Sequence, residues 1–260
     1  MRSGMLLVDK PPNITSGELV RRIERIFGEK AGHTGILDPK VSGLMLVLVG
    51  KARRLAKFFF GMDKEYEGIM HIHREFEERE LRKVVKEFEG EIVQVPPKRS
   101  RVARVPRKRK VYYFRILKIE GRDVHFKVKC EAGTYIRKIC HDIGEKMGKG
   151  AHMKWLRRLK VGNFSVKKAV KLEELERSKE PKKYLIPLEK IPEILKFSIA
   201  EIREEETFRR ARNGVPLKMD EIAIKKRIDN KAIAVYYKKR LVGIGREKEG
   251  RLKWDCVLAD

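Results

Sequence analysis

The sequence predicts a mixed α/β (α+β) protein with two domains, residues 1–190 and 196–260. Apolar or alternating runs of strand length are interspersed with amphipathic runs of helical period, and three prolines between 180 and 196 mark a shift in composition. Beyond that shift, short strands with glycine turns indicate a small β domain. The expected strands of the first domain lie at 4–9, 44–50 and 64–73 and in a hairpin at 111–133. Its expected helices lie at 16–28, 77–90, 134–148 and 170–180.

The first strand and helix have clear boundaries. GMLLVD is apolar and ends at KPPN, where two prolines exclude a helix. Thr15 or Ser16 can cap the helix that follows, and Gly28 can end it. Its apolar residues fall on one face, as expected for a helix packed on a core.

Asp38 lies in the next segment, GHTGILDPKVSG, at 32–43. Its glycines and proline indicate an ordered loop, and the wholly apolar LMLVLVG that follows indicates a buried strand. The loop is therefore attached to the interior of a sheet, where functional groups are often held.

The segment PPKRSRVARVPRKRK, 96–110, combines many basic residues with three prolines and few apolar ones. Such a segment cannot bury itself, so it is expected to be an extended, mobile arm that contacts phosphates. A solvated linker is the alternative.

The helix at 134–148 is expected to begin at a Thr134 cap. Its buried face would be formed by Ile136, Ile139, Cys140, Ile143 and Met147. The same period places Arg137 and His141 side by side, off the apolar stripe.

The formal net charge of +26 points to a polyanionic partner, most plausibly nucleic acid, although a heat-adapted surface rich in ions is an alternative. The three cysteines are too scattered for a disulfide framework or a zinc site. No run is long and apolar enough for a membrane span or a signal peptide, so a soluble, cytoplasmic (intracellular) protein without a membrane partner is expected. No Walker A or GxGxxG motif is found, which gives no indication of a nucleotide cofactor.

A carboxylate in a phosphate-binding groove repels the ligand, so Asp38 calls for a role as general base, nucleophile or metal ligand, or for the simpler role of a turn residue. A metal site is not favoured, because clustered carboxylates are missing near Asp38. The pair His71 and His73 lacks an obvious third ligand and is interpreted as structural or as an RNA contact. If Asp38 is buried it needs a partner, for which an arginine is the natural choice.

Six stretches of the sequence, among them the segment that contains Asp38, resemble the TruB class of pseudouridine synthases. The resemblance covers AGHTGILDPKVSG, VDKPPNITS, DKEYEG, VPPKRS, CEAGTYIRKICHDIG and GAHMKWLRRLKVG, in unbroken order over most of residues 5–170. RKVYY, CEAGTYIRKICHDIG and GAHM are more similar to the archaeal and eukaryotic branch, the dyskerin-like catalytic subunit of H/ACA ribonucleoproteins. NGVPLKMDEI and AVYYKKRLVGIGR resemble a PUA domain.

The resemblance implies a fold and a set of site residues. The fold would be a pseudouridine synthase core with a bent, mainly antiparallel mixed sheet in 1–190, followed by a small PUA-like β-barrel in 196–260. Asp38 would be the catalytic carboxylate and Arg137 its partner, while Tyr66 would lie against the uracil and help remove its C5 proton. Leu156 would cover the other face of the base, and His33 would help fill the space left by the flipped nucleotide. Further RNA contacts are expected from Lys40, Lys98, Arg99, Arg107, Lys108 and Arg109.

The implied function is conversion of uridine to pseudouridine in rRNA, as the catalytic subunit of an H/ACA guide ribonucleoprotein. Neither a cofactor nor a metal is implied. The partners would be guide RNA, an rRNA or tRNA substrate and small H/ACA core proteins, with a nucleolar location if the source is eukaryotic. Two alternatives stay open: a stand-alone synthase for the T-loop of tRNA, and a non-catalytic RNA-binding assembly factor.

Overall fold

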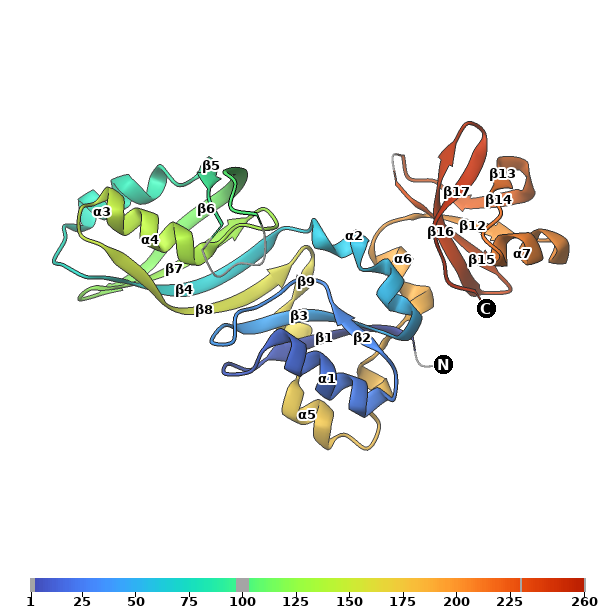
Figure 1. Ribbon diagram of the computed structural model, residues 1–260, viewed down its shortest axis with the longest axis horizontal. Helices are drawn as coiled ribbons and strands as arrows, with labels where there is room; N and C mark the ends of the chain where they lie inside the picture. The colour runs from blue at the N-terminus through green and yellow to red at the C-terminus, as the bar shows by residue number, and fades with distance from the viewer. Residues whose placement is uncertain (1–2, 97–102, 230, 260) are drawn as a thin grey trace.

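The computed structural model describes residues 3–96, 103–229 and 231–259, which form two β-sheets of mixed direction, flanked by helices (Figure 1). Within these residues the larger sheet has eleven strands, in the order β10-β1-β3-β8-β4-β7-β6-β5, with β11 beside β1, β2 beside β3 and β9 beside β8. Its strands are β1 (Gly4–Lys10), β2 (Ala31–His33), β3 (Ser42–Val49), β4 (Lys64–Ile72), β5 (Gly90–Gln94), β6 (Arg107–Glu120), β7 (Asp123–Cys130), β8 (Ala151–Val161), β9 (Phe164–Ser165), β10 (Val170–Lys171) and β11 (Ile186–Pro187). The expected mixed α/β fold class is confirmed.

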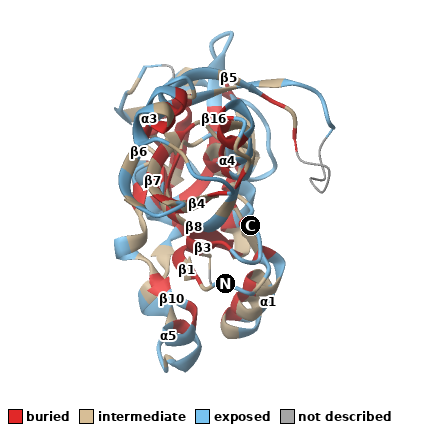
Figure 2. Ribbon diagram, turned by 90° about the vertical axis from the view of Figure 1, so that its left-hand side faces the viewer, coloured by how far each residue is buried: buried red, intermediate tan, exposed pale blue. Residues whose placement is uncertain are grey.

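The helices cover different parts of the larger sheet. The α-helices are α1 (Ser16–Phe27), α2 (Lys57–Phe60), α3 (Glu78–Lys86), α4 (Ile136–Lys146), α5 (Leu172–Arg177), α6 (Ile191–Ile194) and α7 (Glu205–Arg212). The 3-10 helices are η1 (Gly50–Leu55), η2 (Val166–Lys168), η3 (Pro181–Tyr184), η4 (Leu188–Lys190) and η5 (Met219–Glu221). Figure 1 shows α3 and α4 beside the β4–β8 part and α1 and α5 beside the β1–β3 part. Buried residues gather in the strands between them (Figure 2).

The two parts of this sheet meet where β3 and β8 pair in parallel over two residues. Gly43 of β3 has φ +108°, and a Cβ there would lie 2.3 Å from the carbonyl oxygen of Arg158. Only glycine allows the two backbones to approach so closely. The Asp38 loop, which precedes β3 in the chain, lies beside this joint.

The first helix confirms its predicted boundaries. Thr15 Oγ1 accepts a hydrogen bond from Glu18 N–H at 3.0 Å, and Gly28 adopts the left-handed conformation at φ 64°. Helix α4 has the expected buried face, but the predicted Thr134 cap is wrong. Helix α4 begins after Tyr135, and the Thr134 hydroxyl donates instead to the Glu131 carbonyl at 2.8 Å.

Three further predictions need correction. The segment 32–43 is not loop throughout, because β2 includes Gly32 and His33 and pairs with β3. The arm at 96–110 is not extended and free over its whole length, since Arg107–Lys110 form the start of β6 and pair with β5. Cross-strand pairing compensates for the lack of apolar residues there. Strand β8, the longest neighbour of β4, was not predicted, because its many basic residues hide its alternation.

Within the described residues the smaller sheet has six strands in the order β13-β17-β16-β15-β12-β14. These are β12 (Ser198–Ile202), β13 (Leu217–Lys218), β14 (Ile222–Lys226), β15 (Ile233–Tyr237), β16 (Arg240–Lys248) and β17 (Arg251–Val257). The two edge strands, β13 and β14, are joined by η5 alone, so the sheet must curl toward a barrel. The domain boundary between residues 190 and 196 stays a prediction. Among the described residues, no helix is both long and apolar enough to cross a membrane.

Candidate active site

Asp38 lies on the loop 34–41, between β2 and β3. Hydrogen bonds to the backbone of this loop hold it in place. The Leu37 carbonyl and N–H both bond to the hydroxyl of Ser16, at 2.9 Å each. The Asp38 carbonyl accepts from Val41 N–H at 3.0 Å, and the Pro39 carbonyl accepts from the N–H of residue 13 at 2.8 Å. Helix α1 thereby fixes the loop from one side.

Lys10 also donates a hydrogen bond to this loop. It is fully buried at the end of β1, and its ammonium group donates to the carbonyls of Pro11, Ile14 and Pro39 at 2.9, 2.8 and 3.1 Å. Burial, with a smaller contribution from the charge of Arg158, lowers the pKa of Lys10 to about 8. The lysine is therefore a structural donor whose charge is costly to keep.

Arg158 of β8 holds the loop from the other side. Its side chain is buried, and it donates to the carbonyls of Leu44, Gly35 and Ile36 at 2.7, 3.2 and 3.4 Å. The carbonyls of all residues from 35 to 39 are therefore hydrogen-bonded, which fixes the backbone that carries Asp38.

The Asp38 carboxylate forms an ion pair with Arg137 of α4. Both side chains are about half exposed, at 50% and 51%. The expected pairing is present, although Asp38 is not buried. An exposed pair contributes little to stability, so its significance lies in where the rigid loop and the start of α4 hold it.

Tyr66 and Leu156 face the same side of the sheet. Tyr66 pairs with Arg158 across β4 and β8, and Leu156 pairs with Gly68. Tyr66 and Leu156 are both buried. A Cβ at Gly68 would lie 2.9 Å from Leu156 Cδ1, which is too close. Glycine at position 68 therefore avoids a clash with the leucine side chain.

The phenol of Tyr66 is held in its neutral form. Burial raises its pKa, and the positive charge of Arg158 opposes that rise without reversing it. A neutral phenol already carries a proton on its oxygen. It can accept a second proton only if it passes its own proton to another group at the same time.

The remaining predicted contacts are spread more widely. His33 is half buried at the end of β2, its pKa is lowered mainly by burial, and its Nδ1 has no hydrogen-bond partner among the described residues. Lys40 is exposed beside Asp38. Lys98 and Arg99 lie outside the described residues.

The three basic residues of β6 differ in their surroundings. Lys108 pairs with Glu91 of β5 at 2.9 Å. Arg109 lies against Gly133, close to the turn that leads into α4, while Arg107 is partly exposed at the start of β6. Arg109 is therefore closer to Arg137 in the fold than the sequence indicates.

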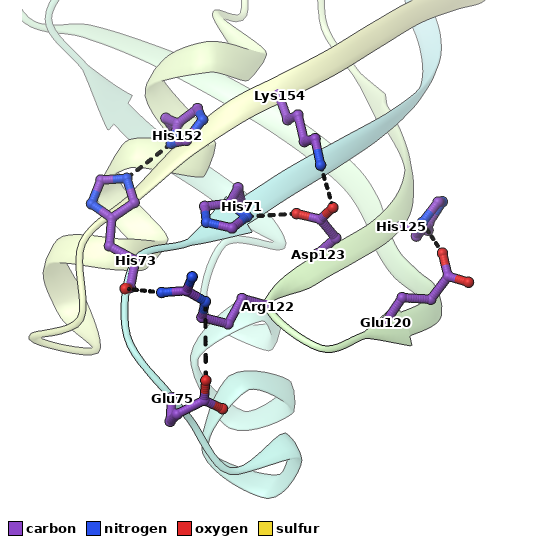
Figure 3. Close-up of polar contacts among 9 residues, drawn as sticks. All are labelled: His71, His73, Glu75, Glu120, Arg122, Asp123, His125, His152 and Lys154. Carbon is purple, nitrogen blue, oxygen red and sulfur yellow. Dashed lines mark hydrogen bonds and ion pairs between the residues drawn. The ribbon is translucent and has the colours of Figure 1, made fainter.

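The histidines 71 and 73 form a separate cluster at the far end of β4 (Figure 3). His71 Nδ1 lies 2.6 Å from Asp123 Oδ1, and His73 Nε2 lies 2.9 Å from His152 Nδ1. His71 is five residues from Tyr66, roughly 17 Å along the strand and on the opposite face. No group of three His, Cys, Asp or Glu side chains within the described residues could hold a metal ion. These contacts fit the structural interpretation of the pair.

Sequence reasoning missed Lys10, Ser16 and Arg158. The signal for Arg158 was its separation of two from Leu156, which puts both on one face of a strand. No comparable local signal identifies Lys10, because its most distant acceptor lies 29 residues away.

Comparison with known proteins supports the grouping of these residues. The model of the N-terminal domain of TruB family pseudouridylate synthases matches residues 22–79 and 71–136, and that of the tRNA pseudouridylate synthase B C-terminal domain matches 137–191. A probable tRNA pseudouridine synthase B from Methanopyrus kandleri is 51% identical over 173 residues, which cover 66% of this chain and 51% of the relative. The chain thus matches about half the length of that curated relative.

Two solved structures align over nearly the whole chain. One, from a Cbf5-Nop10-Gar1 complex, has a TM-score of 0.82 and 36% identity, and covers 99% of this chain and 85% of the other. The second, an H/ACA RNP bound to a substrate RNA containing 2'-deoxyuridine, has a TM-score of 0.79 and 35% identity, with 99% and 85% covered. Together with the family models, these matches show that the chain belongs to the TruB family of pseudouridine synthases.

Proposed function

We propose that this protein converts uridine in RNA to pseudouridine, with Asp38 as the catalytic carboxylate. The observation that carries the proposal is the Asp38–Arg137 pair on a loop whose carbonyls are hydrogen-bonded from residue 35 to residue 39. In a protein with a net charge of +26, a carboxylate held this firmly beside a polyanion reduces affinity. A catalytic role explains why it is there.

The reaction conserves every atom of the nucleotide. The C1′–N1 bond breaks, the uracil turns, and C1′ joins C5 while the C5 proton is lost and N1 gains one. Asp38 would either attack C1′ or take the 2′ proton. Both roles need an ionised carboxylate, and the Arg137 guanidinium balances its charge.

Tyr66 and Leu156 would contact the uracil. They lie on the face of the sheet that leads to Asp38, which supports this role. The neutral Tyr66 phenol suits contact with the ring and relay of the C5 proton rather than permanent action as a tyrosinate. The nucleotide would have to leave its stack, at a cost of a few kcal/mol, and His33 would help fill the space left behind.

The RNA would be held by basic residues on the Asp38 loop and on the segment that leads into β6. Lys40 lies next to Asp38, and Arg107, Lys108 and Arg109 lie at the start of β6. With Lys98 and Arg99 they would contact the phosphates. The curled sheet of residues 196–260 would serve as a PUA-like domain that binds guide RNA.

We further propose that the protein acts on rRNA within an H/ACA ribonucleoprotein, together with small core proteins. The solved structures that cover most of this chain come from Cbf5-Nop10-Gar1 and H/ACA RNP complexes, which supports this reading. The name of the Methanopyrus relative, probable tRNA pseudouridine synthase B, favours instead a stand-alone enzyme for tRNA.

Pseudouridine formation would be measured on a tRNA transcript and on an rRNA fragment, the latter with and without guide RNA and core proteins. Conversion of the rRNA fragment only with guide and core proteins is the expected result. Conversion of tRNA by the protein alone would favour the stand-alone enzyme. No product in any mixture would favour a non-catalytic assembly factor.

Asp38→Asn tests the catalytic assignment. The variant keeps the side-chain shape and loses the charge, so the single-turnover rate should fall by at least about 1,000-fold. RNA affinity should stay equal or improve, because a repulsive charge has been removed. A variant that retains even a tenth of the activity would contradict the role of Asp38.

A further inference from the structure

Arg158 combines deep burial with a set of acceptors that is unusual for an arginine. Its side chain is 2% exposed, and the acceptors of its three hydrogen bonds are main-chain carbonyls. A buried cation is costly unless every donor is used. The charge of the guanidinium also contributes, after burial, to the lowered pKa values of two other buried cations, Lys10 and Lys64. Such an arrangement calls for a reason.

The guanidinium links separate parts of the candidate site. From β8 it reaches Leu44 at the start of β3 and the loop residues Gly35 and Ile36, which precede Asp38. Arg158 also lies directly opposite Tyr66 in the pairing of β4 with β8. A planar fork with five donors in fixed directions can meet these acceptors together.

Two glycines lie beside Arg158, and the close approach of the backbones requires glycine only at Gly43. Gly43 permits β3 to approach the main chain of Arg158, and a Cβ at Gly35 would lie at an ordinary contact distance of 3.7 Å from its Nη1. The neighbouring Arg157 points to the other face and pairs with Asp9 at 2.6 Å. Adjacent arginines thus have different surroundings, and Arg158 alone of the two contacts the Asp38 loop.

We infer that Arg158 is a positioning residue, which fixes the loop carrying Asp38 against the strand carrying Tyr66. The inference rests on the proposed function, in which both side chains must meet one nucleotide. Because Arg158 is buried, it acts through the loop and through Tyr66, and RNA would not touch it.

The test compares Arg158→Lys with Arg157→Lys, the same change at the next residue. Lysine keeps the charge but has no fork, so it cannot bind the carbonyls of Gly35, Ile36 and Leu44 in their present geometry. Arg158→Gln is the second variant, in case the lysine variant does not fold. Unfolding midpoints would establish that the variants compared are folded. The full chain is used throughout, with the RNA on which the unaltered protein is active.

Two readouts are expected to change together in the Arg158 variants. Amide hydrogen exchange of a peptide covering residues 34–41 should become at least about 10-fold faster, since carbonyls of the loop lose their donor. The single-turnover rate should fall by about 100-fold, the usual consequence of misplacing a reacting group by roughly 1 Å. RNA affinity should change by less than about threefold, so that the loss lies in the rate and not in binding. Arg157→Lys should leave all three unchanged.

The outcomes separate this inference from the proposed function. A normal rate in folded Arg158→Lys, or a lost rate with unchanged exchange at 34–41, would overturn the positioning role. If the unaltered protein forms no pseudouridine on any substrate, the proposed function fails. The exchange comparison then still decides whether Arg158 fixes the loop: unchanged exchange refutes it, and faster exchange upholds it.

Discussion

At the scale of single residues, the candidate site depends on buried cations that bind main-chain oxygens. Lys10 donates to the Pro39 carbonyl of the Asp38 loop, Arg158 donates to its Gly35 and Ile36 carbonyls, and Ser16 bonds to Leu37 in its middle. Arg158 and Ser16 satisfy carbonyls in this way, while Lys10 adds a second donor to the Pro39 carbonyl, which also accepts from the N–H of residue 13. The loop therefore owes its fixed shape to residues that do not face the substrate.

Lys10→Met is expected to change how stability depends on pH. The pKa of Lys10 is about 8 in the folded protein and 10.5 when unfolded, so between these values the unfolded chain binds more protons and stability rises with pH. Removing the lysine should lower that slope by up to about 1.4 kcal/mol per pH unit. The variant should also lose about 1–3 kcal/mol at pH 8, because the carbonyls of Pro11 and Ile14 lose the ammonium donor.

Urea unfolding between pH 8 and 9.5 measures both effects, below the range in which tyrosines ionise. Lys40→Met is the control, since it removes an exposed lysine from the same loop and leaves the three carbonyls bound. Equal slopes for the Lys10 variant and the unaltered protein would show that Lys10 is not buried as a cation.

The residue types that act over short distances could be predicted from the sequence. Thr15 and Gly28 delimit α1 because a cap acts on its own helix turn. Thr134 was assigned wrongly, since its hydroxyl had an alternative acceptor in Glu131. Lys10 and Arg158 could not be predicted as buried, because their acceptors come from distant segments and a basic residue is usually on the surface.

At the scale of elements, β8 joins the two parts of the larger sheet and carries Leu156 and Arg158 on the site face. Register shifts at β8 interrupt its alternation, which is one physical reason why it escaped prediction. The β6–β7 hairpin was predicted because its alternation is regular on the buried side. The start of β6 was not, since pairing with β5 decides its structure.

Changing Arg107, Lys108 and Arg109 together to Ala should weaken RNA binding and flatten its dependence on salt. Each lost phosphate contact lowers the slope of log K against log salt by about 0.7–0.9. Lys108 is already paired with Glu91, so a decrease for two contacts, about 1.4–1.8, is expected. Filter binding between 50 and 200 mM salt would measure this slope.

The matched control removes three positive charges from α3, at Arg79, Arg82 and Lys83, which are exposed. It should leave the slope near that of the unaltered protein, because none of the proposed phosphate contacts lies on α3. If both triple variants flatten the slope equally, net charge alone governs binding and the start of β6 has no special role.

At the scale of the whole molecule, the curled C-terminal sheet packs on the segment η1–α2 and on α6 (Figure 1). Phe58 and Phe197 meet edge to face with ring centroids 5.0 Å apart, and Lys57 pairs with Asp255 at 3.3 Å. Arg54 also donates to the Val257 carbonyl at 2.5 Å. The shift in composition after residue 180 predicted a second structural unit. The contacts between the two sheets could not be predicted, because they join residues far apart in the sequence and follow no periodic pattern.

Phe58→Ala should loosen this contact. The half-buried ring contributes an aromatic pair of about 0.5–1.5 kcal/mol in addition to its apolar area, so the variant should lose about 2–3 kcal/mol. The loss falls on the contact between the two sheets, where buried residues of both sheets form one apolar cluster. Differential scanning calorimetry should therefore show a broader transition, or two resolved ones, in place of a single cooperative transition.

Phe60→Ala is the matched control, because Phe60 lies on the same helix and is 52% exposed. Its stability should stay within about 0.5 kcal/mol of the unaltered protein, with an unchanged transition. If the two variants behave alike, the sheets are not coupled through Phe58. The contact between the two sheets would then depend on the shared apolar cluster and on the polar pairs of Arg54 and Lys57. A clear difference would mean that the Phe58–Phe197 contact, together with that cluster and those pairs, sets the distance between the two sheets within this chain.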